Sequence, residues 1–248
     1  DDTIHRVPVA YLVCNFAPKT QDHPSLLSHR EVVTFLHETG HCLHHLFTRV
    51  DRPNIAGTNG FEWDAIELPS QLMEDFAWDR GVSQAMSGHH ETGAALPDSL
   101  YDKLIAARHF LSGLFIVRQV EFALFDLLLH VGTMGSDPME VIEAVRDEVA
   151  VIRPPSWHRF PHAFSHIFAG GYASGYYSYL WAEVLAADGF QHFAEAGLID
   201  RSIAGKFRDK VLARGASRPA ADSFRAFRGR DADPAAMLVR HGLTADAH

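Results

Sequence analysis

The segment His37-Glu38-Thr39-Gly40-His41 constrains this chain more than any other feature of its sequence. It lies inside a stretch with helical periodicity, Glu31 to Thr48, so two imidazoles four residues apart share one face of a predicted helix. That separation allows both to bind one tetrahedral zinc ion through bonds of about 2.0–2.1 Å. Glu38 projects beside them, where it can take a proton from a metal-bound water.

The same pentapeptide also fits an ordinary amphipathic helix that carries two surface histidines. The chain has 17 histidines, which makes chance matches more frequent than usual. Apolar residues already give this helix a stripe that faces the core. The choice between a zinc site and a surface helix therefore depends on the rest of the chain.

A catalytic zinc needs a third protein ligand, and the sequence offers two candidates. Glu67 lies between two apolar residues on the next helical segment, Trp63 to Asp79, and a buried carboxylate needs a partner such as a metal. His44 shares the face of the two histidines, but three ligands on one straight helix cannot easily close a tetrahedron, so a supporting or packing role is favoured. Glu74 shares the face of Glu67 and can hydrogen-bond a ligand imidazole. Solvated surface carboxylates are the alternative for both acids.

Helical spacing accounts for most of the chain. Residues 7–16 form an extended apolar stretch that predicts a strand or two. Further helices are predicted over roughly 97–130, 138–149 and 175–187, with three shorter ones after them. The predicted fold is therefore mainly α, a multi-helix domain with a small β element near the N-terminus.

Length, charge and cysteine content narrow the possible partners. The 248 residues, 47% of them hydrophobic, can bury a core as one large domain or two small ones. A formal charge of −9 argues against a nucleic acid or an anionic membrane as partner, and no apolar run approaches a membrane span. No signal peptide is visible, and only two cysteines are present, so a reducing, cytoplasmic setting is expected.

A glycine- and tyrosine-rich segment, residues 170–179, is a second candidate for function. Glycines let a backbone approach a ligand closely, and a phenolic hydroxyl can donate to the carbonyl oxygen that becomes negative during peptide hydrolysis. The alternative is a turn leading into an aromatic core helix, because aromatic residues at helical spacing are usually buried. Composition alone does not decide between a substrate-binding segment and a turn into the core.

Four strings carry a family resemblance: Ala10–Phe16, His37–His45, Trp63–Gln71 and Ser165–Tyr172. They resemble the catalytic half of the thimet oligopeptidase and neurolysin family of zinc peptidases, closest to its bacterial oligopeptidase A branch. The resemblance covers nearly the whole chain. It implies that residues 1–248 are a zincin-like catalytic portion that lacks the N-terminal helical region of the family, as expected for a chain that begins without methionine.

The resemblance also implies a ligand set. His37, His41 and Glu67 match the zinc ligands, with one Zn²⁺ per chain, and Glu38 matches the general base. Thr39 stands where the family usually has phenylalanine, a position that is neither ligand nor base.

Tyrosines of the second segment match family residues as well. Tyr172 and Tyr179 match tyrosines that contact substrate and stabilise the transition state, and Tyr179 is expected to hold the oxyanion. His166 matches a further active-site histidine, and Tyr176 is a predicted substrate contact.

The sequence thus predicts a zinc metalloendopeptidase that cleaves short oligopeptides, with the zinc-bound water activated by Glu38. Its expected partners are short peptides and the missing N-terminal portion. A dipeptidyl carboxypeptidase of the same family and a non-catalytic peptide-binding fragment are alternatives. A redox metal such as iron is a third, because two histidines and one carboxylate also suit that chemistry.

Overall fold

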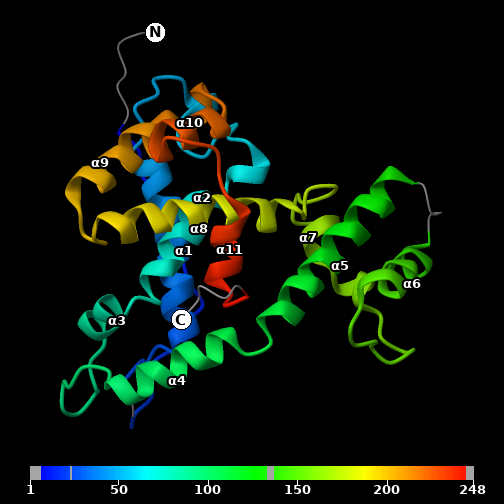
Figure 1. The fold of residues 1–248 in the computed structure, drawn as a ribbon, viewed down its shortest axis with the longest axis horizontal. Coiled ribbons are helices and arrows are strands. Elements are labelled where there is room, and N and C mark those ends of the chain that lie inside the picture. The colour runs from blue at the N-terminus through cyan, green and yellow to red at the C-terminus, as the bar shows by residue number, and fades with distance from the viewer. Residues whose placement is uncertain (1–6, 23, 133–136, 244–248) are drawn as a thin grey trace. The chain divides into compact units, whose positions relative to one another are not determined.

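The computed structural model describes residues 7–22, 24–132 and 137–243, and the regular structure in these ranges is helical (Figure 1). The α-helices are α1 (His29–Leu46), α2 (Leu68–Phe76), α3 (Arg80–Met86), α4 (Asp98–His109), α5 (Ser112–Val131), α6 (Pro138–Val149), α7 (Ser165–Phe168), α8 (Ser178–Ala196), α9 (Arg201–Lys210), α10 (Ala220–Arg228) and α11 (Pro234–Arg240). Short 3-10 turns are η1 (Pro53–Ile55), η2 (Trp63–Ala65), η3 (Phe160–Ala163) and η4 (Leu212–Ser217). None of the described helices is both long enough and apolar enough to cross a membrane. The mainly α prediction is confirmed.

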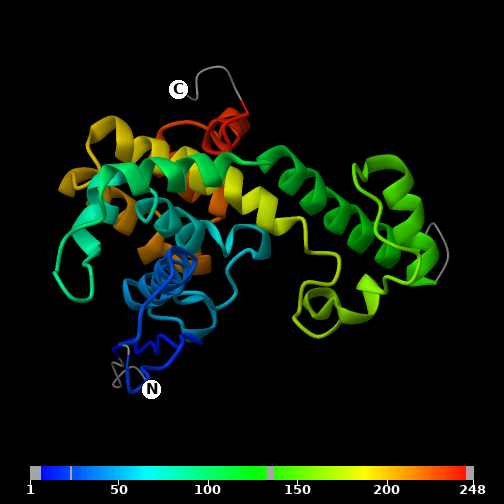
Figure 2. The ribbon, with the colours of Figure 1, turned by 90° about the horizontal axis from the view of Figure 1, so that it is seen from below.

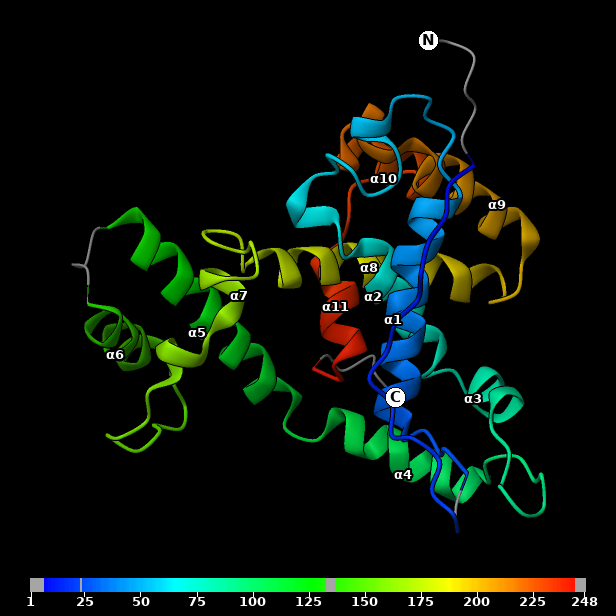
Figure 3. The ribbon, with the colours of Figure 1, turned by 180° about the vertical axis from the view of Figure 1, so that it is seen from behind.

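The predicted N-terminal β element is wrong. Residues 7–20 have no regular secondary structure and run alongside α1 (Figure 3). Their apolar side chains are largely exposed, with Tyr11 at 87% and Val13 at 77%. Such residues favour extended backbone, but a strand also needs a neighbour to pair its N–H and C=O groups. The part of the chain that the structure describes contains no strand to pair with.

The long helix predicted over 97–130 is two helices, α4 and α5, joined by a short non-helical link (Figure 2). Leu111 has a left-handed backbone, with φ of 56°, which interrupts the helix. Apolar residues continue on both sides of the break, and Ser112-Gly113, a turn dipeptide directly after Leu111, was the available signal.

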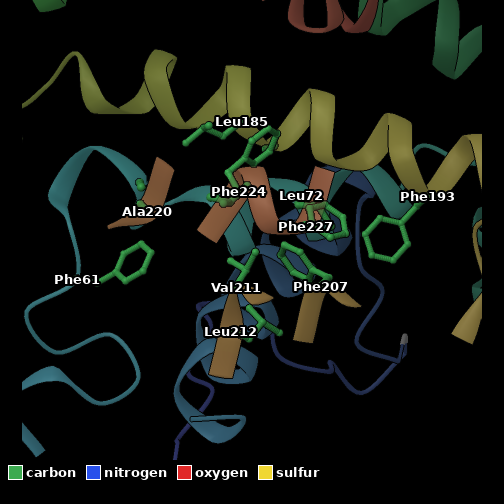
Figure 4. Packing of buried hydrophobic residues seen from close by; sticks show 13 residues of the cluster. Phe61, Leu72, Leu185, Phe193, Phe207, Val211, Leu212, Ala220, Phe224 and Phe227 are labelled. Carbon is green, nitrogen blue, oxygen red and sulfur yellow. The ribbon is translucent and has the colours of Figure 1, made fainter. Parts of the chain in front are cut away.

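The chain divides into two compact units. Unit 1 comprises Asp1–Arg108 and Ala182–Met237, and unit 2 comprises His109–Trp181 and Leu238–His248. Figure 4 shows the core of unit 1, in which side chains from α2, α8, α9 and α10 meet. Phe227 is fully buried there, and its ring lies edge-on to Phe207 with centroids 5.1 Å apart. This core holds α2 in place, and α2 in turn packs against α1.

The start of α1 follows from a capping box. The Ser28 hydroxyl accepts from the backbone N–H of Glu31, and the Glu31 carboxylate accepts from the backbone N–H of Ser28 at 2.7 Å. Two of the four otherwise unpaired donors at the helix start are thereby satisfied. The box fixes where the helix begins.

The crossing of α1 and α2 requires Gly40. A Cβ atom at this position would lie 2.5 Å from both the carbonyl oxygen of Pro69 and the Cα of Ser70. Glycine in a helix ordinarily costs about 0.5–1 kcal/mol relative to alanine, and here it permits the close approach of two backbones. That approach brings the N-terminus of α2 to the metal-motif helix.

Gly40→Ala is therefore expected to lower the free energy of unfolding by about 3 kcal/mol, because the obstructing atoms belong to backbone and cannot rotate away. Urea unfolding followed by circular dichroism measures the change. Gly205→Ala is the matched control, since an added Cβ in α9 meets no atom within 4 Å and should be neutral or stabilising. Equal stability of the Gly40→Ala variant and the original chain would contradict the close-approach argument.

Candidate metal centre

Two imidazoles of α1 form one side of the centre. The rings of His37 and His41 have centroids 5.0 Å apart and stand nearly perpendicular, at 83°. His37 Nδ1 lies 2.6 Å from Glu74 Oε1 of α2. A carboxylate partner makes Nδ1 the donor, which leaves the lone pair on Nε2 for a metal.

Glu67 provides the other side. It immediately precedes α2, is 5% exposed, and points Oε2 at both histidines, 3.4 Å from His37 Nε2 and 3.1 Å from His41 Nε2. The hydroxyl of Ser70, one turn into α2, lies 2.8 Å from the same Oε2 and donates to it. The sequence analysis did not identify Ser70 as a partner of Glu67. Its position three residues after Glu67, at the start of a helix, was the available signal.

The three side chains fit a zinc ion. Their ligand atoms all lie within 4.8 Å of one another. Ligands about 2.05 Å from a tetrahedral metal lie roughly 3.3 Å apart, close to the two nitrogen–oxygen separations just given. Burial lowers the pKa of His37, but its hydrogen bond to Glu74 and the surrounding carboxylates raise it, and the net direction is upward. The raised pKa of His37 indicates a negative electrostatic potential around its ring, and such a potential also favours a bound cation.

Glu38 is half-buried beside this group, close enough for its charge to raise the pKa of His37. Within the described ranges its carboxylate has no hydrogen-bond or ion-pair partner.

His44 lies in the core of unit 1. It is fully buried, and its ring stands edge-on to Phe61 with centroids 4.6 Å apart. Neither ring nitrogen has a hydrogen-bond partner among the described residues, and burial lowers its pKa to about 4. The structure therefore places a neutral imidazole here, outside the group of three possible ligands. A supporting role toward the metal stays a prediction.

The predicted tyrosines gather in unit 2. Tyr172 and Tyr179 stack with centroids 4.8 Å apart, and the exposed ring of His166 lies 6.2 Å from Tyr179. Tyr176 is buried, and its hydroxyl donates to Gln119 Oε1 at 2.9 Å. Burial raises the pKa of Tyr176 to about 12, so this phenol stays protonated at neutral pH. The two half-buried tyrosines and His166 form a polar aromatic group, while Tyr176 packs beneath it in the core of unit 2.

Two histidines of an HExxH helix with a glutamate from the following helix are the ligand set of a class of zinc metallopeptidases. The chain belongs to peptidase family M3, whose family model matches residues 2–243. This confirms the resemblance seen in the sequence.

Curated relatives agree with the family. The chain is 49% identical over 239 residues to "Oligopeptidase A" of Escherichia coli (strain K12), covering 95% of this chain and 35% of that protein. It is 35% identical over 250 residues to "Saccharolysin" of Saccharomyces cerevisiae, covering 98% of this chain and 35% of that protein. It is also 36% identical over 244 residues to "Dipeptidyl carboxypeptidase" of Escherichia coli (strain K12), with 95% and 35% covered. The chain thus spans about a third of the length of these relatives.

Proposed function

We propose that the chain is the catalytic portion of a zinc metalloendopeptidase that cleaves short oligopeptides. The observation that carries this proposal is the convergence of His37, His41 and Glu67, with nitrogen–oxygen separations that suit one tetrahedral ion. Membership of family M3 and the 49% identity to an oligopeptidase A support the same substrate class.

The residues of the chain take separate roles in the proposed reaction. His37, His41 and Glu67 would hold the zinc ion, which would supply an activated water and polarise the scissile carbonyl. Glu38 accepts the proton of the attacking water and delivers it to the leaving amine. Glu74 keeps His37 in the tautomer that presents Nε2.

The tyrosine group of unit 2 acts on the substrate in this proposal. Tyr179 donates a hydrogen bond to the developing oxyanion, and Tyr172 and His166 contact the peptide. Tyr176 supports Tyr172 and Tyr179 by packing against them in the core of unit 2. It also keeps the proposed role of a substrate contact. The remainder of a family-length polypeptide is the proposed partner, and the cytoplasm is the proposed location.

Metal analysis followed by a peptide assay tests the proposal. We expect about one zinc per chain, and hydrolysis of short peptides that stops with a chelator and returns when zinc is added. Because the relatives are longer, the assay is run with the chain alone and with a family-length protein that contains it. Bound zinc without hydrolysis in either form would indicate a peptide-binding protein, and bound iron would indicate the redox alternative.

Release of C-terminal dipeptides is a second candidate, favoured by the 36% identity to a dipeptidyl carboxypeptidase. Peptides with an amidated C-terminus separate the two activities. An endopeptidase cleaves them at rates similar to the free acids, whereas a dipeptidyl carboxypeptidase requires the free carboxylate.

A further inference from the structure

Asp126 is a fully buried carboxylate in the middle of α5 that the proposed reaction does not use. Its Oδ1 accepts from the backbone N–H of Ser174 at 2.9 Å, and its Oδ2 accepts from the backbone N–H of Tyr176 at 2.8 Å. His130 Nδ1, one turn along α5, lies 2.9 Å from Oδ1. One carboxylate thereby holds two amides of a segment that is about 50 residues away in sequence.

The segment it holds, residues 172–176, is here called the tyrosine turn. The N–H of Gly175 donates to the carbonyl of Tyr172 at 2.8 Å, and the N–H of Tyr172 donates to the carbonyl of His166 at 3.0 Å. Ser174 has φ of 56°, in the left-handed region. This conformation is unfavourable for a non-glycine residue, so the surroundings must stabilise the turn. The backbone N–H groups at 174 and 176 donate charge-assisted hydrogen bonds to Asp126, and these bonds supply that stabilisation.

The turn determines where the phenols lie. Tyr172 opens it, and Tyr179 follows it in the first turn of α8. Their rings stack 24° from parallel. Tyr176, the last residue of the turn, packs into the core of unit 2, and its ring centroid lies 5.2 Å from that of Tyr179. Loosening the amides at 174 and 176 would release the backbone that spaces these rings.

We propose that Asp126 is a positioning residue, which clamps the tyrosine turn so that Tyr172 and Tyr179 keep the geometry required for substrate and oxyanion binding. This inference rests on the proposed peptidase function. Asp126 does not contact substrate in this account, and it acts only through the backbone of the turn.

Asp126→Asn tests the clamp with little change in volume. The amide of asparagine offers one acceptor, so its NH₂ group faces one backbone N–H and leaves that donor unpaired in a buried site. Glu121→Gln is the matched control. Glu121 is also a buried acid of α5, but it pairs with Arg118 and Arg146 rather than with the turn.

Two readouts are compared in these variants. Amide hydrogen exchange by NMR is expected to be at least about tenfold faster in Asp126→Asn at Ser174 or Tyr176, whichever N–H faces the new NH₂ group, and unchanged at both in Glu121→Gln. In the peptide assay, kcat is expected to fall about 100-fold with KM within roughly threefold, because the transition-state contacts are misplaced. If Asp126→Asn does not fold, Asp126→Glu takes its place, since it keeps the charge and shifts both acceptors by one methylene.

Unchanged exchange at both amides in the folded variant, or unchanged kcat, overturns the proposal. An equal fall of kcat in Glu121→Gln also overturns it, because the effect would then be a general loss of stability. A third outcome is possible: neither the chain alone nor the family-length protein hydrolyses peptides, while Asp126→Asn accelerates exchange at one of the two amides. In that case the proposed function fails and the clamp on the turn is supported.

Discussion

Glu38→Gln is expected to lower kcat for peptide hydrolysis by about three to four orders of magnitude, while the variant keeps its metal. The amide has nearly the same shape as the carboxylate but cannot accept the proton of the attacking water. Because Glu38 is not among the three side chains whose ligand atoms converge, its replacement should leave metal affinity nearly unchanged. The loss should therefore fall on kcat, with KM altered little.

Two measurements separate this outcome from a structural effect. Zinc content and thermal unfolding should match those of the original chain. Glu148→Gln, an exposed acid-to-amide change on α6, should leave turnover unaffected. Near-normal turnover of Glu38→Gln would remove Glu38 as the general base, and loss of zinc would instead place it among the ligands.

The local part of the centre could be predicted from sequence because it depends on helical spacing. The four-residue interval between His37 and His41 places both rings on one face of α1 whatever the rest of the chain does. Glu67 was predictable as a candidate because an acid between apolar residues needs a buried partner. These inferences use only neighbours in the sequence.

What the sequence did not predict depends on contacts between distant segments. The close approach at Gly40 involves backbone some 30 residues away, and Ser70 matters only because Glu67 turns its carboxylate toward α1. The N-terminal stretch has strand-forming residues but no strand beside it. Likewise, the break at Leu111 is a left-handed residue next to Ser112-Gly113, and the apolar spacing on both sides of it obscured that turn signal.

Glu67→Ala is expected to abolish stoichiometric metal binding. It removes the only carboxylate among the three converging ligand atoms and leaves two imidazoles on one helix, which cannot enclose a tetrahedral ion. Loss of a residue that merely supports a ligand typically weakens metal binding about 10- to 100-fold, and loss of this ligand should exceed that range. Titration with zinc against a competing chelator measures the affinity.

A graded series makes the prediction specific. Glu74→Gln weakens the hydrogen bond that orients His37, and Ser70→Ala removes the donor to Glu67 Oε2. Each should therefore reduce zinc affinity by about 10- to 100-fold. The order expected is therefore a small loss for Ser70→Ala and Glu74→Gln and a much larger one for Glu67→Ala. Stoichiometric zinc in Glu67→Ala would move the third ligand elsewhere, with His44 the first candidate. Because that imidazole is buried against Phe61, its recruitment would require α1 to repack against the core of unit 1, which should be visible as a fall in unfolding free energy.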